Sequence, residues 1–298
     1  MTSIVTRFAP SPTGRLHLGH AWSALLAHDF ARAAGGAFLL RIEDIDPGRA
    51  RPELVDGIIQ DLMWLGLSWD DEIVYQSERL PLYASALDRL KAQALAYPCF
   101  CTRSAIAAEI VASASAPHPG SGSGAGGPDG PVYPGTCRKL PEEEQACRIA
   151  AEPHAWRLDM AAALASVSPL SWADSSAGEV AARPELFGDV VLARKDAPTS
   201  YHLAVTVDDA AQGITDIVRG CDLFQATHVH RLLQALLDLP TPAYHHHALL
   251  ADAEGKRLAK RHGAPTLAAL RAAGADPAEL LERLRRRQMP AGYSIAGA

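Results

Sequence analysis

The sequence predicts an α/β protein built on a parallel sheet, with a separate segment inserted between the two halves of that sheet. Two observations indicate the sheet: strand-like and helix-like segments alternate over residues 4–96, and they alternate again beyond residue 187. A third observation indicates the insertion. From Ser113 to Pro131 the chain is nearly all Ser, Gly, Ala and Pro, which bury too little apolar surface to offset the entropy of ordering. We therefore expect a loop without regular structure there.

The N-terminal elements follow from periodicity and turn residues. Ile4 to Phe8 has the pattern of a short buried strand, and a helix is expected from near His17 to about Ala34, where two glycines end it. Ala37 to Ile42 is expected to form a second strand. Apolar residues recur at helical spacing from Pro52 to Leu65, and a further helix is expected from Leu80 to Ala96.

The second half of the chain continues this alternation. Strands are expected at Asp189–Arg194, Tyr201–Val207 and Ile214–Arg219, followed by a helix at Leu223–Leu237. A last strand at His245–Leu250 and two short helices at Leu267–Ala273 and Pro277–Arg287 complete the expected order.

The composition of the 298 residues is that of an ordinary globular protein, with 48% apolar and 21% charged residues. The net charge of -6 argues against indiscriminate binding to nucleic acid. The chain has no run of 18 apolar residues and no signal-peptide pattern, so we expect a cytoplasmic protein without a membrane segment. Its five cysteines are then expected to be reduced, and clustered ones are candidate metal ligands.

The first chemical motif lies between a strand and a helix and reads Pro10-Ser11-Pro12-Thr13-Gly14-Arg15-Leu16-His17-Leu18-Gly19-His20. A helix start presents unpaired backbone N–H groups and the positive end of the helix dipole, and Gly19 lets a ligand approach the backbone. His17 and His20 fall on one face of the first turn. The arrangement suits the phosphates of ATP, although a pair of histidines at a helix start also serves purely structural roles.

Further candidates are expected at strand ends, where α/β sheets bind ligands. Arg41-Ile42-Glu43-Asp44, with Asp46, places carboxylates after the second strand, and the alternative is a solvated acidic turn. Tyr201 and Arg219 can hold a substrate carboxylate. Arginine is the better choice because its planar fork pairs with both carboxylate oxygens, and the alternative is a core tyrosine with a surface arginine.

A basic loop and a group of sulfur ligands complete the candidates. The loop Lys256-Arg257-Leu258-Ala259-Lys260-Arg261 follows a predicted strand, and taken alone it is a charged stretch of surface. Cys99, Cys101 and Cys137 offer three thiols and Tyr133 a phenol, whereas zinc takes four N, S or O ligands. Buried reduced cysteines are the alternative, and Cys147 and His118 are alternative fourth ligands.

The first motif resembles the HIGH signature of class I aminoacyl-tRNA synthetases, here in the form His17-Leu18-Gly19-His20. The preceding stretch, residues 7–14, is similar to the glutamyl and glutaminyl branch of that family. Residues 41–46, 201–209 and 219–223 resemble further motifs of the branch, and residues 257–261 resemble its KMSKS loop. There are two departures: Ile45 stands where Thr is usual, and Ala259 replaces the usual serine, which removes one hydroxyl contact.

This resemblance implies a class I synthetase fold with a Rossmann-like parallel sheet. The catalytic domain would comprise residues 1–96 and 187–262, the latter carrying the KMSKS-like loop. Residues 97–186 would form an inserted, zinc-binding subdomain, and residues 263–298 a short C-terminal helical segment without an anticodon-binding domain.

The resemblance also implies the chemistry. A carboxylate of L-glutamate attacks the α-phosphate of ATP, with Mg²⁺ on the nucleotide, and the enzyme positions the reactants and stabilises phosphate charge. Catalysis is then assigned to His17, His20 and Lys260. ATP would be bound by His17, Gly19, His20, Arg257 and Lys260, glutamate by Arg7, Phe8, Ala9, Pro10, Ser11, Glu43, Tyr201 and Arg219, and Zn²⁺ by Cys99, Cys101, Tyr133 and Cys137.

The chain stops where a complete glutamyl-tRNA synthetase would continue, and it thereby resembles the truncated glutamyl-queuosine enzymes of the family. These attach glutamate to the queuosine base in the anticodon of tRNA(Asp), so the resemblance implies tRNA(Asp) carrying queuosine as the partner of a monomer. The alternatives are a truncated glutamyl-tRNA synthetase that charges a tRNA 3′ end and a non-catalytic tRNA-binding module.

Overall fold

A computed structural model describes residues 3–114, 126–252, 265–290 and 292–296. Within these residues no helix is long and apolar enough to cross a membrane. The predicted basic loop, residues 256–261, lies outside the described residues, and so does most of the predicted Gly/Ser-rich loop.

The centre of the fold is parallel β-structure. One parallel sheet has the order β1-β2-β3, with β1 at Val5–Phe8, β2 at Ala37–Ile42 and β3 at Asp70–Tyr75. Two further strands, β11 (Asp216–Gly220) and β12 (Ala243–His247), pair in parallel with each other. The N–H of Thr215 donates to the carbonyl oxygen of Val5 at 3.0 Å. This contact lays β11 beside β1, so the two halves of the chain meet at the middle of the parallel structure.

The remaining strands extend or surround this centre. β8 (Ser171–Asp174) pairs in parallel with β12, and β9 (Gly178–Ala181) pairs antiparallel with β8. There are three further antiparallel groups. The first joins β4 (Ala96–Cys99), β7 (Ala155–Leu158) and β10 (Val191–Ala193). The second is the hairpin of β5 (Gly126–Gly127) and β6 (Gly130–Pro131), and the third pairs β13 (Leu249–Asp252) with β14 (Tyr293–Ala296).

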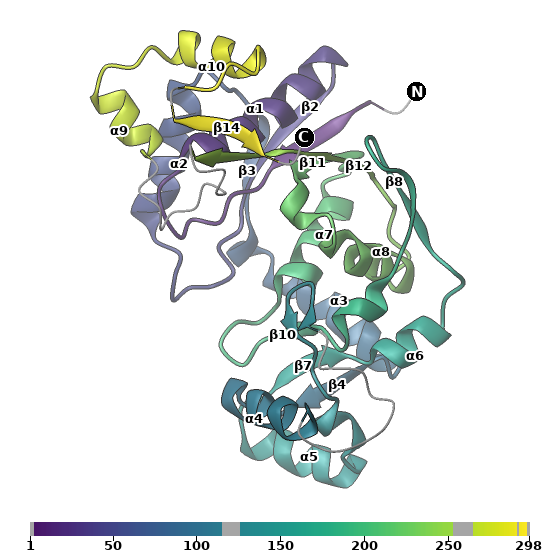
Figure 1. The fold of residues 1–298 in the computed structure, drawn as a ribbon. Coiled ribbons are helices and arrows are strands. Elements are labelled where there is room, and N and C mark those ends of the chain that lie inside the picture. Colours follow the sequence, from purple (N-terminus) through teal and green to yellow (C-terminus); the bar gives the residue numbers. More distant parts are fainter. Residues whose placement is uncertain (1–2, 115–125, 253–264, 291, 297–298) are drawn as a thin grey trace.

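Helices cover the sheets. In chain order they are α1 (Leu18–Ala33), α2 (Pro52–Trp64), α3 (Leu80–Ala92), α4 (Arg103–Ala114), α5 (Glu142–Ala151), α6 (Met160–Ala165), α7 (Tyr201–Ala211), α8 (Ala226–Leu236), α9 (Leu267–Ala272) and α10 (Pro277–Arg285). α1 packs against β1, β2 and β11. Figure 1 shows α4 and α5 at one end of the molecule and α9 and α10 at the other.

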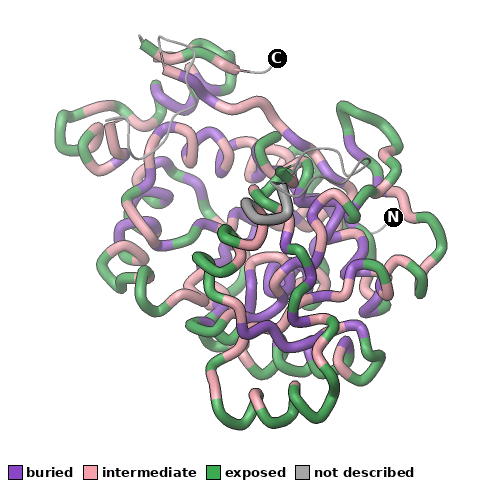
Figure 2. Tube along the Cα trace, turned by 60° about the horizontal axis from the view of Figure 1, so that its bottom comes forward, coloured by how far each residue is buried: buried purple, intermediate pink, exposed green. Residues whose placement is uncertain are grey.

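Two apolar clusters form most of the core. The first surrounds α1 and joins β1 and β2 to residues of the C-terminal helices, with Leu25, Phe38 and Leu284 among its fully buried members. The second packs α3 against α7 and α8, around Leu90, Leu203 and Val229. In Figure 2 the buried trace concentrates in the interior and the exposed trace follows the rim. Each cluster therefore contains residues from both halves of the chain.

Most predicted elements are confirmed, including the strands at residues 4–8 and 37–42 and the helices that begin near His17, Pro52 and Leu80. The predicted helix from Leu80 to Ala96 is too long, because it ends at Ala92 and β4 begins at Ala96. The predicted strand from His245 to Leu250 is divided into the end of β12 and the start of β13. β14 was not predicted, and the end of the predicted Gly/Ser-rich loop forms the hairpin β5-β6.

The predicted strand from Tyr201 to Val207 is wrong, because these residues begin helix α7. The side chain of Ser200 caps this helix by accepting a hydrogen bond from the N–H of Leu203. Residues 203–209 are all buried, including Asp208 and Asp209, so the helix is covered on nearly every side. A fully buried segment shows no polar face, and its period cannot distinguish a helix from a buried strand.

The four-part division of the chain into residues 1–96, 97–186, 187–262 and 263–298 stays a prediction. β8 and β9 fall within the range 97–186, yet they join the sheet of β11 and β12.

A buried carboxylate joins α7 to the segment before and within α3. Asp208, which is fully buried, accepts hydrogen bonds from Gln76 Nε2 at 2.8 Å, Arg79 Nε at 2.7 Å and Tyr83 Oη at 2.7 Å. Three donors from residues 76–83 therefore depend on one side chain more than 120 positions away along the chain.

We expect Asp208→Ala to lower the free energy of unfolding by about 3–5 kcal/mol, because the change leaves buried donors and a partly buried arginine without their carboxylate. Urea denaturation measures this loss. The matched control is Asp88→Ala, an exposed carboxylate on α3, which should leave the unfolding midpoint within experimental error. Equal losses from the two variants would contradict the role of Asp208.

Candidate functional site

A cavity of about 300 Å³ lies at the carboxyl ends of β1, β2 and β11, beside the start of α1. This is the edge at which α/β sheets bind ligands. The cavity brings together all the predicted glutamate-binding residues and the predicted nucleotide-binding residues that the structure describes, namely Arg7, Phe8, Ala9, Pro10, Ser11, His17, Gly19, His20, Glu43, Tyr201 and Arg219. Their individual roles stay predictions.

The two histidines of the first motif cap α1. His17 Nδ1 accepts from the N–H of Gly19 at 3.1 Å, and His20 Nδ1 accepts from the N–H of His17 at 3.1 Å. Their ring centroids are 3.9 Å apart. A Cβ atom on Gly19 would lie 3.0 Å from the ring of His17, so any other residue here would push this ring from its present position. The structural role considered for the pair is thus real, and it leaves both rings at the wall of the cavity.

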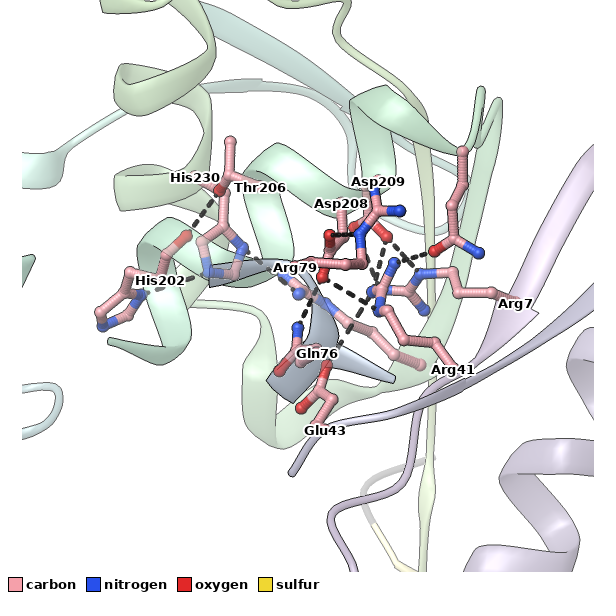
Figure 3. Close-up of polar contacts among 12 residues, drawn as sticks. Arg7, Arg41, Glu43, Gln76, Arg79, His202, Thr206, Asp208, Asp209 and His230 are labelled. Carbon is pink, nitrogen blue, oxygen red and sulfur yellow. Dashed lines mark hydrogen bonds and ion pairs between the residues drawn. The ribbon is translucent and has the colours of Figure 1, made fainter. Parts of the chain in front are cut away.

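A buried ion cluster holds Arg7, which lines the cavity. Asp209 receives Arg7 Nε at 2.8 Å and Arg41 Nη2 at 2.8 Å, and Figure 3 shows both guanidinium groups pointing at it. Burial alone would raise the pKa of Asp209, but the two arginines outweigh it and hold this pKa below its usual value. Asp209 therefore stays ionised, and Arg7 is charge-paired before any ligand binds.

Glu43 lies beside this cluster, with Oε1 3.9 Å from Arg41 Nη2. Burial raises the pKa of Glu43 to about 7, although the charges of Arg41 and Arg7 act in the opposite direction. The carboxyl group is thus poised between its two protonation states near neutral pH. A cationic ligand group placed beside it would favour the ionised form.

Arg219 differs from the other cavity arginines in having only neutral partners. Its Nε donates to His246 Nε2 at 3.1 Å, its Nη1 contacts His230 Nδ1 at 3.3 Å, and its Nη2 donates to Thr227 Oγ1 at 2.6 Å and to the carbonyl oxygen of Leu223 at 3.1 Å. Among the described residues no carboxylate oxygen lies within 4.0 Å of this guanidinium, which is 5% exposed. A buried cation without an anion favours an anionic ligand.

The predicted role of Arg219 in holding a substrate carboxylate stays a prediction, and the same contacts show how much of its guanidinium is already occupied. Four protein acceptors take four of the five N–H hydrogens of this side chain, so one N–H, on Nη1, is left for a ligand.

The histidines around Arg219 are neutral. Burial lowers the pKa of His246 to about 4, and the adjacent charge of Arg219 acts in the same direction. Burial and Arg219 likewise hold the pKa of His230 well below its usual value. Tyr201 also lines the cavity, and burial raises its pKa to about 12, so its phenol keeps the proton and can donate to a carboxylate.

Lys260 and Arg257 lie outside the described residues, between Asp252 and Pro265. Described residues near both sides of that gap lie at the cavity or contact its wall. Leu249 and Leu250 line it, and Thr266 forms a β-bridge with His17.

The predicted sulfur ligands converge. The Sγ atoms of Cys99, Cys101 and Cys137 all lie within 4.8 Å of one another, and Tyr133 Oη is 3.4 Å from Cys101 Sγ. Thiolates bound to one zinc ion at about 2.3 Å in a tetrahedron stand roughly 3.8 Å apart, so the cluster fits such an ion without large movement. Cys147 is exposed on α5 and does not belong to the group, and His118 lies outside the described residues.

A second cavity of about 800 Å³ adjoins the first and shares Tyr201 with it. Its walls come from the β5-β6 hairpin, the start of α4 and the segment before α7, and they carry Arg103, Asp129, Arg157, Arg194, Lys195 and His202. The volume is in the range of sites that hold nucleotide-sized ligands.

Sequence reasoning missed the residues that hold the cavity side chains in place. Asp209 was part of a quoted motif but had no assigned role, and Asp174, Thr227, His230 and His246 were not singled out. The only sequence signal for Asp209 is a charged pair at the end of an otherwise apolar segment. Buried charges of this kind are uncommon unless they are paired.

Comparisons with known proteins agree with this geometry. Residues 3–295 match the family model of tRNA synthetases class I (E and Q), catalytic domain. The chain is 50% identical to the glutamyl-Q tRNA(Asp) synthetase of Rhodobacter capsulatus, over 93% of this chain and 98% of the relative. It is 46% identical to that of Symbiobacterium thermophilum, over 93% and 84%.

Among solved structures, the glutamate-tRNA synthetase of Elizabethkingia anophelis superposes with a TM-score of 0.73 at 29% identity. The superposition covers 89% of this chain and 55% of that one, so the chain spans about half the length of that synthetase. The predicted fold class, an α/β class I synthetase fold with a parallel sheet, is confirmed.

We expect Glu43→Gln to stabilise the ligand-free protein more at pH 8.5 than at pH 5.5, by a difference of about 2 kcal/mol. The pKa of Glu43 is about 7 in the folded protein against an ordinary 4.5, so its ionised form is disfavoured by folding. The resulting loss of stability is absent well below pH 4.5, grows as pH rises above 4.5, and is complete above pH 7. Glutamine cannot ionise and avoids it.

Urea denaturation of both proteins at the two pH values measures this difference. Glu72→Gln, on the exposed part of β3, is the control and should show no such dependence on pH. A stability gain of Glu43→Gln that is the same at both pH values would contradict the raised pKa.

Proposed function

The chain belongs to the class I tRNA synthetases for glutamate and glutamine, and from that premise we propose that it activates L-glutamate with ATP and transfers it to the queuosine base of tRNA(Asp). As a member of this family it is a ligase. The observation that carries the choice of glutamate is Arg219, a buried cation with neutral partners, in one cavity with Glu43 and Tyr201.

The cavity suits the two ends of glutamate. The α-carboxylate must remain open to attack ATP, so the carboxylate held by the protein is that of the side chain. Tyr201 and the remaining N–H of Arg219 can donate to it, and Arg7 adds positive charge nearby. Glu43, once ionised, can accept hydrogen bonds from the α-ammonium group. The ammonium would in turn favour the ionised carboxyl.

In the first step an oxygen of the glutamate α-carboxylate attacks the α-phosphorus of ATP, the bond to the bridging oxygen of the β-phosphate breaks, and pyrophosphate leaves. We propose that His17, His20 and Gly19 at the start of α1 hold the nucleotide, whose Mg²⁺ offsets phosphate charge. Lys260 and Arg257 are proposed to neutralise the leaving pyrophosphate. Leu250, shortly before these residues, lines this cavity, and Thr266, shortly after them, pairs with His17 of the cavity wall, which supports the assignment.

In the second step a hydroxyl oxygen of the acceptor nucleotide attacks the activated carbonyl carbon, AMP leaves, and the hydroxyl proton passes to solvent. The adjoining cavity is the proposed entrance for that nucleotide, because it meets the glutamate cavity at Tyr201 and carries several cationic side chains. The names of the two bacterial relatives support queuosine as the acceptor.

Labelled glutamate tests the proposal. We expect label from [¹⁴C]glutamate and ATP on native tRNA(Asp) that contains queuosine, and none on an unmodified tRNA(Asp) transcript of the same sequence. Label on tRNA(Glu) instead would indicate charging of a 3′ end. If added glutamate does not increase the rate of ATP–pyrophosphate exchange with any of these tRNAs present, glutamate activation itself is overturned.

We also propose that Cys99, Cys101 and Cys137 hold one structural Zn²⁺, with Tyr133 as the fourth ligand. The ion would join the end of β4 to the turn at residues 136–139 and so shape one side of the second cavity, which both Cys101 and Tyr133 line.

Metal analysis of the purified protein should find one zinc per chain. Cys137→Ser should lose it, whereas Cys147→Ser, which changes an exposed cysteine outside the group, should retain it. Zinc that is retained by Cys137→Ser, or lost from Cys147→Ser, would contradict the proposed ligand set.

A further inference from the structure

We infer that Asp174 is a positioning residue for the glutamate cavity: it holds His246 in the one tautomer that presents a lone pair to Arg219. The inference rests on the proposed function in one respect, namely that Arg219 contacts the substrate carboxylate.

Three adjacent strands bring these side chains into line. Asp174 ends β8, His246 lies in β12 and Arg219 lies in β11, and β12 pairs with both of the other strands. Asp174 Oδ2 is 2.8 Å from His246 Nδ1, and His246 Nε2 is 3.1 Å from Arg219 Nε. The side chains of Asp174 and His246 are 1% and 3% exposed, so water does not compete for these hydrogen bonds.

Only one tautomer of His246 satisfies both neighbours. An ionised carboxylate can only accept, so Nδ1 must carry the proton, and a neutral imidazole then has its lone pair on Nε2. Arginine can only donate, so it needs that lone pair. The other tautomer, or a protonated ring, would set an N–H of His246 against the N–H of Arg219.

The orientation of Asp174 is itself determined by the turn that follows β8. Its Oδ1 accepts from the N–H groups of Ser176 and Ala177, each at 2.9 Å, which leaves Oδ2 for His246. Oδ2 also accepts from the backbone N–H of His246, at a longer 3.3 Å. An asparagine in this position satisfies the two shorter hydrogen bonds when its carbonyl oxygen stays on the turn. Its NH₂ group would then face His246 Nδ1, which would have to become the acceptor, and the proton would move to Nε2.

Asp174→Asn is therefore a nearly isosteric change that reverses the tautomer of His246. We expect the KM for glutamate in ATP–pyrophosphate exchange to rise about 10- to 100-fold, the range for loss of one hydrogen bond to a charged group. We expect kcat at saturating glutamate to change much less. A purely structural role would lower the fraction of active enzyme, which lowers kcat and leaves KM unchanged.

The matched control is Asp216→Asn. Asp216 Oδ1 lies 2.8 Å from His245 Nε2, an Asp–His pair on β11 and β12, and neither residue lines the glutamate cavity. This variant should leave the KM for glutamate within about twofold, a spread that corresponds to well under 1 kcal/mol.

A second variant replaces the imidazole of His246 by a side chain that has no tautomers. In His246→Gln the amide oxygen can accept from Arg219 without help from Asp174, so adding Asp174→Asn to it should raise KM far less than in the wild-type background. Equal effects in the two backgrounds would overturn the inference.

Nitrogen-15 NMR of the His246 ring tests the inference independently of catalysis. We expect a protonated Nδ1 in the wild-type protein and a protonated Nε2 in Asp174→Asn, and an unchanged tautomer would overturn the inference. If wild-type exchange does not depend on glutamate, the proposed function fails, while the NMR result still decides the role of Asp174.

Discussion

The structure depends on the carboxyl groups of Asp208 and Asp209, buried side by side near the end of α7. Asp209 joins Arg7 of β1 and Arg41 of β2 to a helix more than 160 positions later in the chain, and Asp208 joins the segment around α3 to the same helix. Neither the arginines nor the aspartates would be stable in the interior alone, since an unpaired buried charge is strongly disfavoured. Their mutual pairing therefore sets how the two halves of the sheet meet, and the cavity lies along that junction.

Once Asp209 is paired with Arg7 and Arg41, Arg219 is the buried cation whose contacts within the described chain are all neutral. Four acceptors hold its guanidinium in one orientation before a ligand arrives, so binding requires little rearrangement of the site. Fixed dipoles and charges that are oriented in advance are the main electrostatic means by which enzymes favour a charged ligand or transition state. The cavity combines this cation with Glu43, whose carboxyl group can take either protonation state near neutral pH.

The cysteine cluster and the second cavity lie next to each other and share residues. Cys101 and Tyr133 belong to both, so a metal ion held there would act on the shape of the wall that faces Tyr201. A ligand in the second cavity and a ligand in the first would meet at that tyrosine. This geometry would suit the proposed transfer, in which the activated amino acid and its acceptor occupy different cavities.

Local pattern was sufficient to predict most of the alternating elements outside residues 97–186, whereas the site residues and their common cavity were predicted from the resemblance of their motifs to a known family. Glu43 follows β2 and Arg219 lies near the end of β11, and parallel strands present their carboxyl ends at a common edge, so the two side chains are expected at the same edge of the sheet. The helix at Tyr201 could not be predicted in this way, because a segment buried on all sides carries no period that separates helix from strand. The partners of Arg219 could not be predicted either: Asp174 and His246 are 72 positions apart, and their contact exists only because β8 pairs with β12. Pairing between distant strands depends on the packing of the whole chain, and so only the folded structure shows which buried donor meets which acceptor.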